Sequence, residues 1–266
     1  MIDLSTITLG QYASRNSWVH RLDPRTKLIV MTAFMVFIFF WNHICTLIVS
    51  LFLMISVYRI SGLSPCLALR NLRSFFWLFI FTFIVHLFFT EGRIIFRIPW
   101  LQWTITEQGC CMGLFYTIRI ALLIILANLL TLTTSPMELT DGLECLFSPL
   151  KKIRFPAHEI AMMISIALRF IPILLEEMDR IQKAQMSRGA RFHGSWIRRI
   201  RSIIPIIVPL FVSTFRRAND LALAMDARCY RGGENRSSYQ VLIMKKQDWL
   251  VIAGSGIIIV PLSVWG

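Results

Sequence analysis

Long runs without charged side chains alternate with short polar segments in the first half of the chain. The longest run, 28–58, contains no Asp, Glu, Lys or Arg. As one helix it would be about 46 Å long at ~1.5 Å per residue, whereas the hydrocarbon core of a bilayer is ~30 Å thick. The polar pair Asn42-His43 near its middle therefore predicts two short membrane spans. Three further runs predict three more spans: 74–90, 109–134 and 250–265.

Arg119 is the single charged residue inside these predicted spans. Because a charge is costly in hydrocarbon, its side chain must face protein, water or the membrane interface. The favoured interpretation is that the side chain either extends to the membrane interface or pairs with polar groups of the bundle. A residue of a transport path is the alternative.

The second half of the chain alternates apolar and polar positions with the period of long amphipathic helices, over 158–188 and 202–228. Each predicted helix ends in an arginine between two small residues, and the two motifs are 40 residues apart: Ser187-Arg188-Gly189 and Ala227-Arg228-Cys229. Small neighbours allow close approach to another surface, where a guanidinium can form two parallel hydrogen bonds to a carboxylate. The alternative is a pair of ordinary helix C-termini, where arginine suits the dipole and glycine the cap.

Two short motifs predict helix starts. In Asp23-Pro24, the aspartate is a candidate N-cap and the proline a candidate first helical residue. In Ser135-Pro136-Met137-Glu138, Ser135 is a candidate N-cap and Glu138 its partner in a capping box. The first motif precedes the first predicted span, and the second follows the fourth.

Composition and charge indicate a membrane protein with a large basic segment on one side. Hydrophobic residues make up 56% of the chain, against roughly 45–50% in soluble domains, and the mean hydropathy is +0.62. Of the 28 Lys and Arg, 18 lie between Thr134 and Trp249, and four more precede Leu28. Because cytoplasmic loops carry the excess of cations, the N-terminus and this segment are predicted to be cytoplasmic.

The predicted fold is therefore an all-α integral membrane protein with about five transmembrane helices plus a cytoplasmic coupling domain of long amphipathic helices. Its expected parts follow in chain order: a cytoplasmic N-terminal arm at 1–27, a membrane domain of about four spans at 28–134, the cytoplasmic coupling domain at 135–248, and a final transmembrane helix at 249–266.

The sequence contains no motif for catalysis or for binding a cofactor. A Gly-x-x-x-x-Gly-Lys-Ser/Thr phosphate loop, a Gly-x-Ser-x-Gly elbow and a His-Glu-x-x-His pair are all absent. The five histidines are scattered, and the six cysteines form no Cys-x-x-Cys. We therefore expect no catalytic residue, no metal site and no cofactor bound by this chain. Nucleic acid is not an expected partner, because the arginines alternate with apolar helical faces.

Taken in order, the motifs resemble one family over almost the whole chain: the transmembrane coupling components, or T components, of energy-coupling factor (ECF) transporters, the EcfT/CbiQ-like family. The resemblance rests on the following segments: His-Arg-Leu-Asp-Pro-Arg-Thr-Lys at 20–27, Thr-Thr-Ser-Pro at 133–136, Ala-Leu-Arg-Phe-Ile-Pro at 167–172, and the two small-Arg-small motifs. Each motif alone is weakly specific, whereas their order and spacing together are specific. The second arginine motif ends in Cys229, where the family often has glycine.

The resemblance implies the transmembrane scaffold of an ABC-type importer for vitamins or other micronutrients, in a prokaryotic cell membrane. Its partners would be two cytoplasmic ATPases, which bind ATP and Mg, and a small S component that binds the substrate within the lipid bilayer. Arg188 and Arg228 would dock into grooves on the ATPases. The alternative within the family is a T component dedicated to cobalt or nickel uptake. A stand-alone channel or secondary transporter is the alternative from another class, and a membrane enzyme is a third.

The segment 161–175 is apolar apart from Arg169, which gives it more apolar surface than a solvated helix carries. We expect it to pack beneath the spans or beside the S component. Ile164 and Ile173 are the predicted residues of this coupling surface.

Overall fold

The computed structural model describes residues 17–98, 103–149, 156–190, 196–232 and 242–264. The chain divides into two units. The bundle unit comprises Gln11–Gly142 and Leu242–Gly266, and the arm unit comprises Leu143–Val241.

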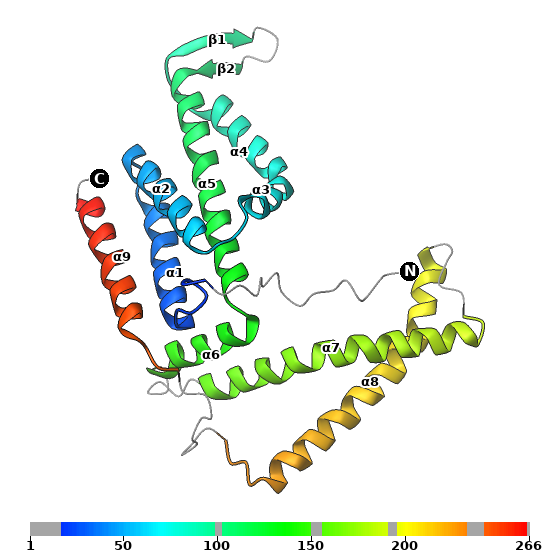
Figure 1. Cartoon of the computed structure of the whole chain (residues 1–266). Coiled ribbons are helices and arrows are strands. Elements are labelled where there is room, and N and C mark those ends of the chain that lie inside the picture. Colours follow the sequence, from blue (N-terminus) through cyan, green and yellow to red (C-terminus); the bar gives the residue numbers. More distant parts are fainter. Residues whose placement is uncertain (1–16, 99–102, 150–155, 191–195, 233–241, 265–266) are drawn as a thin grey trace. The chain divides into compact units, whose positions relative to one another are not determined.

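The bundle unit is built around its longest helix, α5 (Figure 1). Its helices are α1 (Pro24–Phe40), α2 (Ile44–Ile60), α3 (Pro65–Ser74), α4 (Phe76–Phe89), α5 (Glu107–Thr133), the start of α6 (Pro136–Phe147) and α9 (Lys246–Val264). The first four pack against α5, and α9 packs against α1. The uncharged run 28–58 forms two helices, with the break at 41–43, as its polar pair predicted.

One element of the bundle unit was not expected from the pattern. Between α4 and α5, the strands β1 (Ile94–Ile98) and β2 (Trp103–Thr106) form a two-stranded antiparallel hairpin. The hydroxyl of Thr106 accepts the Gly109 amide as the N-cap of α5 and donates to the carbonyl oxygen of Thr90 at 2.8 Å. The hairpin is thereby fixed to the ends of both neighbouring helices.

Two clusters of buried apolar side chains join α1 and α2 to α5. Leu122, Leu129 and Leu132 of α5 are each no more than 2% exposed. The first cluster contains Met31, Tyr58, Leu63, Leu129 and Leu132; the second contains Leu47, Met54, Leu122 and Leu126. Truncating one of these leucines to alanine would cost roughly 2–5 kcal/mol.

Many large apolar side chains lie on the outside of the bundle unit. α4 contains no buried residue, and Phe52, Trp77 and Phe89 are at least 70% exposed. Large aromatic side chains over a whole helix surface suit a lipid environment. Among the described residues, α5 and α7 are long and apolar enough to cross a membrane, while α2 and α4 are shorter apolar helices. The prediction of an all-α membrane protein is confirmed; the number of spans remains a prediction.

The arm unit consists chiefly of two long helices, α7 (Ala157–Ser187) and α8 (Trp196–Ala227), which pack against each other (Figure 1). The start of α7 is tied to the end of α6, where Nδ1 of His158 lies 2.6 Å from Oε1 of Glu144. α8 begins six residues before the predicted 202. Its two prolines, Pro205 and Pro209, lie inside the helix without ending it.

Candidate functional site

The first arginine motif lies at the C-terminus of α7, where the main chain closes the helix in a defined geometry. The amide of Gly189 donates to the carbonyl oxygen of Met186 at 2.9 Å, and that of Ala190 donates to Gln185 at 3.0 Å. Gly189 has φ = 88°, in the left-handed region. This pair of bonds around a left-handed residue is a Schellman motif, with Arg188 as the C-cap.

The second motif repeats that geometry at the end of α8. The amide of Cys229 donates to Asp226 at 2.9 Å, and that of Tyr230 donates to Met225 at 3.1 Å. Cys229 has φ = 56° and is the one residue other than glycine with a positive φ in the described chain. The 40-residue sequence repeat is therefore also a repeat of backbone structure, with Arg228 in the place of Arg188.

All six residues of the two motifs are exposed in the arm unit: Ser187, Arg188, Gly189, Ala227, Arg228 and Cys229. A Cβ placed on Gly189 would have no atom within 4 Å. The cap at each helix end is made by main-chain bonds, and neither guanidinium bonds to another described residue. The main-chain cap thus accounts for the left-handed residue of each motif, Gly189 or Cys229, and requires nothing of the two arginine side chains.

The two helices that carry the motifs are joined by an ion pair. Nη2 of Arg217 lies 3.3 Å from Oε2 of Glu177. The face of α8 that carries Arg217 also contains the buried Ile206 and the half-buried Leu210 and Ser213. From Ile206 to Arg217, these positions follow one another at spacings of four, three and four residues, which places them on one side of a helix.

A different face of α8 is apolar and exposed. Ile204, Val208, Phe211 and Phe215 are each 54–61% exposed and also follow one another at spacings of four, three and four. We call these four residues the α8 apolar row. This row was not predicted, although its spacing is present in the sequence as a second apolar stripe of the same helix.

The coupling surface predicted on α7 is smaller. Ile164 is 41% exposed, whereas Ile173 is half-buried. Of the two predicted residues, Ile164 therefore presents the larger apolar surface.

In the bundle unit, the predicted helix starts are confirmed. Oδ1 of Asp23 accepts the amide of Arg25 at 2.9 Å, with Pro24 as the first residue of α1. Ser135 and Glu138 form the predicted capping box, with both amide-to-side-chain distances 3.2 Å.

Residues from three helices meet around the start of α1, and we call this set the joint: Asp23, Lys27, Thr133 and Asp248. Lys27 is 3% exposed, and its Nζ donates to the carbonyl oxygens of Thr133 at 3.0 Å and His20 at 3.1 Å. Asp248 is 1% exposed; it accepts the amides of Asp23 at 2.9 Å and Lys245 at 2.8 Å. The joint therefore ties the start of α1 to the end of α5 and the start of α9.

The start of α6 also lies directly against α1. A Cβ added to Gly142 would come within 3.2 Å of side-chain carbons of Pro24 and Leu28. The absence of a side chain at Gly142 is what permits this approach. The two family-like motifs at 20–27 and 133–136 thus lie together in space, and sequence reasoning did not identify Asp248 as their third partner.

Arg119 has a structural role in the bundle unit. Its Nε donates to the carbonyl oxygen of Ile38 at 2.6 Å, Nη1 to Oδ1 of Asn42 at 2.7 Å, and Nη2 to the carbonyls of Phe39 and Trp41. The last carbonyls of a helix have no partner within that helix. Arg119 supplies donors for the end of α1 from α5, as the structural interpretation predicted.

The described residues contain no group of three His, Cys, Asp or Glu side chains able to hold a metal ion. The two arginine ends and the α8 apolar row are exposed surfaces of the arm unit.

Comparison with known proteins finds one family. The family model of CbiQ, cobalt transport protein, matches residues 15–239. A relative described as energy-coupling factor transporter transmembrane protein EcfT, from Thermosediminibacter oceani, is 47% identical over 255 residues, covering 96% of each chain. EcfT of Brevibacillus brevis is 44% identical over 263 residues, covering 98% of this chain and 99% of the relative. EcfT of Bacillus subtilis is 43% identical over 251 residues, 94% of each chain.

Proposed function

The chain belongs to the CbiQ/EcfT family of transporter transmembrane proteins, and we propose that it is the scaffold that couples two cytoplasmic ATPases to a substrate-binding S component. The observation that carries the proposal is the repeated, exposed arginine end of α7 and α8. Because the main chain alone closes each helix, the two guanidinium groups remain available to a partner. Two equivalent ends suit two similar ATPase subunits.

Each arginine is proposed to enter a groove on one ATPase and to pair there with a carboxylate. The small residues on both sides allow the helix end to approach a groove wall closely. The planar guanidinium can then form two parallel bonds, which a lysine cannot. ATP and Mg would be bound by the ATPases, and this chain would hold no cofactor of its own.

The S component is proposed to dock on the exposed apolar side chains of the arm unit. The α8 apolar row and Ile164 provide a surface of the kind that marks a protein or membrane contact. Ile173 would contribute less, because it is half-buried. We propose that the N-terminus and the arm unit are on the cytoplasmic side, as the distribution of cations suggests.

The EcfT relatives, at 43–47% identity, favour an ECF-type importer over a stand-alone channel or secondary transporter. Copurification from the native membrane through a tag on this chain tests the assembly. The expected result is a complex with two ATPase polypeptides and one small membrane protein. A homomer that sustains substrate flux alone in vesicles would refute the proposal.

A further inference from the structure

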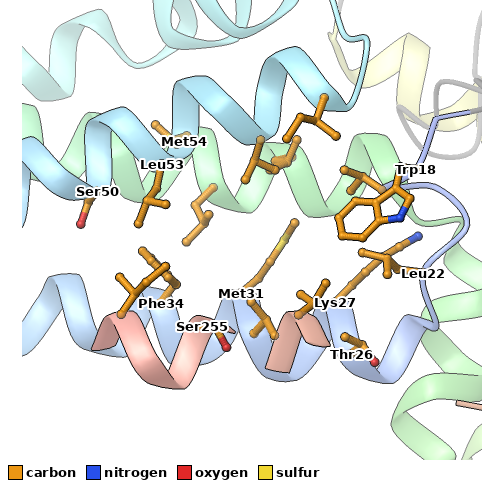
Figure 2. A pocket seen from close by; sticks show the side chains of 18 of the residues that line it. Trp18, Leu22, Thr26, Lys27, Met31, Phe34, Ser50, Leu53, Met54 and Ser255 are labelled. Carbon is orange, nitrogen blue, oxygen red and sulfur yellow. The ribbon is translucent and has the colours of Figure 1, made fainter. Parts of the chain in front are cut away.

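A cavity of about 210 Å³ lies inside the bundle unit, between α1, α2, α5 and α9 (Figure 2). Its wall is mostly apolar, and its polar members are Thr26, Lys27, Ser50 and Ser255. Trp18 and Leu22, from the segment before α1, lie at one end, and Ser50 and Phe34 lie at the other. An apolar cavity of ~150 Å³ in another protein stays dry and accepts an apolar ligand. The cavity here therefore suits an apolar occupant.

Two buried hydroxyl groups in the cavity wall lack a partner. Thr26 is 0% exposed and Ser50 is 3% exposed, and neither hydroxyl has a hydrogen-bond partner among the described residues. Buried polar groups nearly always have one. Thr26 lies at the end of the cavity that Trp18 occupies (Figure 2), so an acceptor oxygen on a bound molecule would satisfy it there.

Two exposed cations stand next to this end of the cavity in the sequence. Arg21 and Arg59 are exposed, and each is adjacent in sequence to a residue of the cavity wall. The nearby acid Asp23 is buried and already accepts an amide of the protein. Trp18 is 44% exposed beside them, and tryptophan is typical of the headgroup level of a membrane.

We infer that this cavity binds one acyl chain of an anionic phospholipid, with the phosphate near Arg21 and Arg59 and an ester oxygen near Thr26. The apolar wall selects the chain, and the two arginines select the charge of the headgroup. A bilayer presents such molecules directly to these helices. The site shares no residue with the arginine ends or the α8 apolar row, so it goes beyond the proposed function and stands independently of it.

The test measures lipid retention by the purified full-length chain. The protein is equilibrated in detergent with phosphatidylglycerol or phosphatidylcholine, and bound lipid is counted by native mass spectrometry while the melting temperature is recorded. The wild type is expected to retain one phosphatidylglycerol and to melt at a higher temperature with it than with phosphatidylcholine. Ser50→Phe, which fills the far end of the cavity, is expected to abolish retention. Ser56→Phe, on the same helix but outside the cavity, is the matched control.

The arginines are tested separately, because they are exposed and their removal leaves the core intact. Each of Arg21→Ala and Arg59→Ala is expected to lower the preference for phosphatidylglycerol about fivefold, the contribution of one cation near an anionic headgroup. Arg73→Ala, an exposed cation outside the cavity wall, should leave the preference unchanged. Equal retention of both lipids by the wild type, or the same preference in the Arg21→Ala/Arg59→Ala double variant, would overturn the inference. A folded Ser50→Phe protein that retains as much phosphatidylglycerol as the wild type would also overturn the inference.

Discussion

Glu177 and Arg217 form an ion pair, with 3.3 Å between Oε2 and Nη2, at matching positions of two helices. Glu177 stands 11 residues before Arg188, and Arg217 stands 11 residues before Arg228. At ~1.5 Å per residue, each helix continues about 16 Å from the ion pair to its arginine. The two arginine ends are thus carried on arms of equal length from a shared contact, which suits two similar docking sites.

The first prediction concerns the two arginines. Arg188→Ala or Arg228→Ala should weaken ATPase association or uncouple ATP hydrolysis from uptake, and the double variant should be worse. Removing one partner of a desolvated charge pair costs roughly 2–5 kcal/mol. Lysine at either position should retain only part of the ATPase association and uptake, because it lacks the planar guanidinium that forms two parallel bonds. The measurements are copurified ATPase and substrate uptake in vesicles.

Two other exposed arginines on the same helices serve as controls for that experiment. Arg180→Ala and Arg216→Ala remove a cation from α7 and α8 without touching either motif, and both should behave as the wild type. Normal assembly and uptake in the double Arg188→Ala/Arg228→Ala variant would mean that the motifs are ordinary helix ends.

The second prediction concerns the apolar surface of the arm unit. Phe211→Asp, in the α8 apolar row, should release the S component while the ATPases remain bound, because a charge would be buried in an apolar contact. Ile164→Asp should also weaken binding of the S component. Asn219→Asp adds the same charge at an exposed position of α8 and is the matched control. Unchanged copurification of the S component with Phe211→Asp would exclude this surface.

The third prediction concerns the left-handed residues of the two caps. Cys229→Gly should stabilise the end of α8 by up to about 1 kcal/mol, because a side chain in the left-handed region costs ~1–2 kcal/mol and glycine's greater freedom when unfolded offsets part of the gain. Gly189→Ala should weaken the end of α7 by a similar amount. No atom lies within 4 Å of the added Cβ, so the effect comes from the backbone alone. Hydrogen exchange at 186–190 and 226–230 measures both, and faster exchange in Cys229→Gly would contradict the argument.

The fourth prediction concerns Arg119. Arg119→Met should lower the unfolding free energy by roughly 2–3 kcal/mol, because the carbonyl oxygens at the end of α1 would lose their donors. The unfolding free energy of Arg119→Lys should lie between those of Arg119→Met and the wild type, since one ammonium group cannot replace three separate guanidinium nitrogens. Thermal unfolding in detergent measures the loss. A variant that melts like the wild type but fails to transport would instead indicate a transport-path role.

The fifth prediction concerns Asp248 of the joint. Asp248→Asn leaves one of two amide donors, from Asp23 or Lys245, facing an NH2 group rather than a carboxylate oxygen. The expected cost is about 1–3 kcal/mol, seen as faster hydrogen exchange at the starts of α1 and α9. The exposed Asp226 of α8 provides the control variant Asp226→Asn. Equal exchange in Asp248→Asn and the wild type would show that these bonds do not hold α9.

Much of the local structure could be predicted from the sequence, because its causes lie within a few residues. The N-cap at Asp23 and the capping box of Ser135 and Glu138 connect residues two or three apart. The repeated ends of α7 and α8 follow from small residues after an amphipathic stretch. Uncharged runs and a polar break sufficed to separate α1 from α2.

Features that depend on distant partners could not be read in the same way. Asp248 bonds to a residue 225 positions away, and the donors of Arg119 reach carbonyls about 80 positions away. The sequence showed that Arg119 needed a partner but not which one. The α8 apolar row lies within the predicted helix 202–228, but the sequence did not show which apolar side of that helix would remain exposed.

The residue that closes α8 makes the two helix ends alike in backbone shape but unequal in stability. Gly189 adopts its left-handed backbone without steric cost, whereas Cys229 holds the same backbone against the preference of its own side chain. The last turn of α8 is therefore the less stable of the two and should open more often than the last turn of α7. If each end docks on one ATPase, as proposed, the two contacts would differ in how often their helix end is formed, although both ends carry the same arginine.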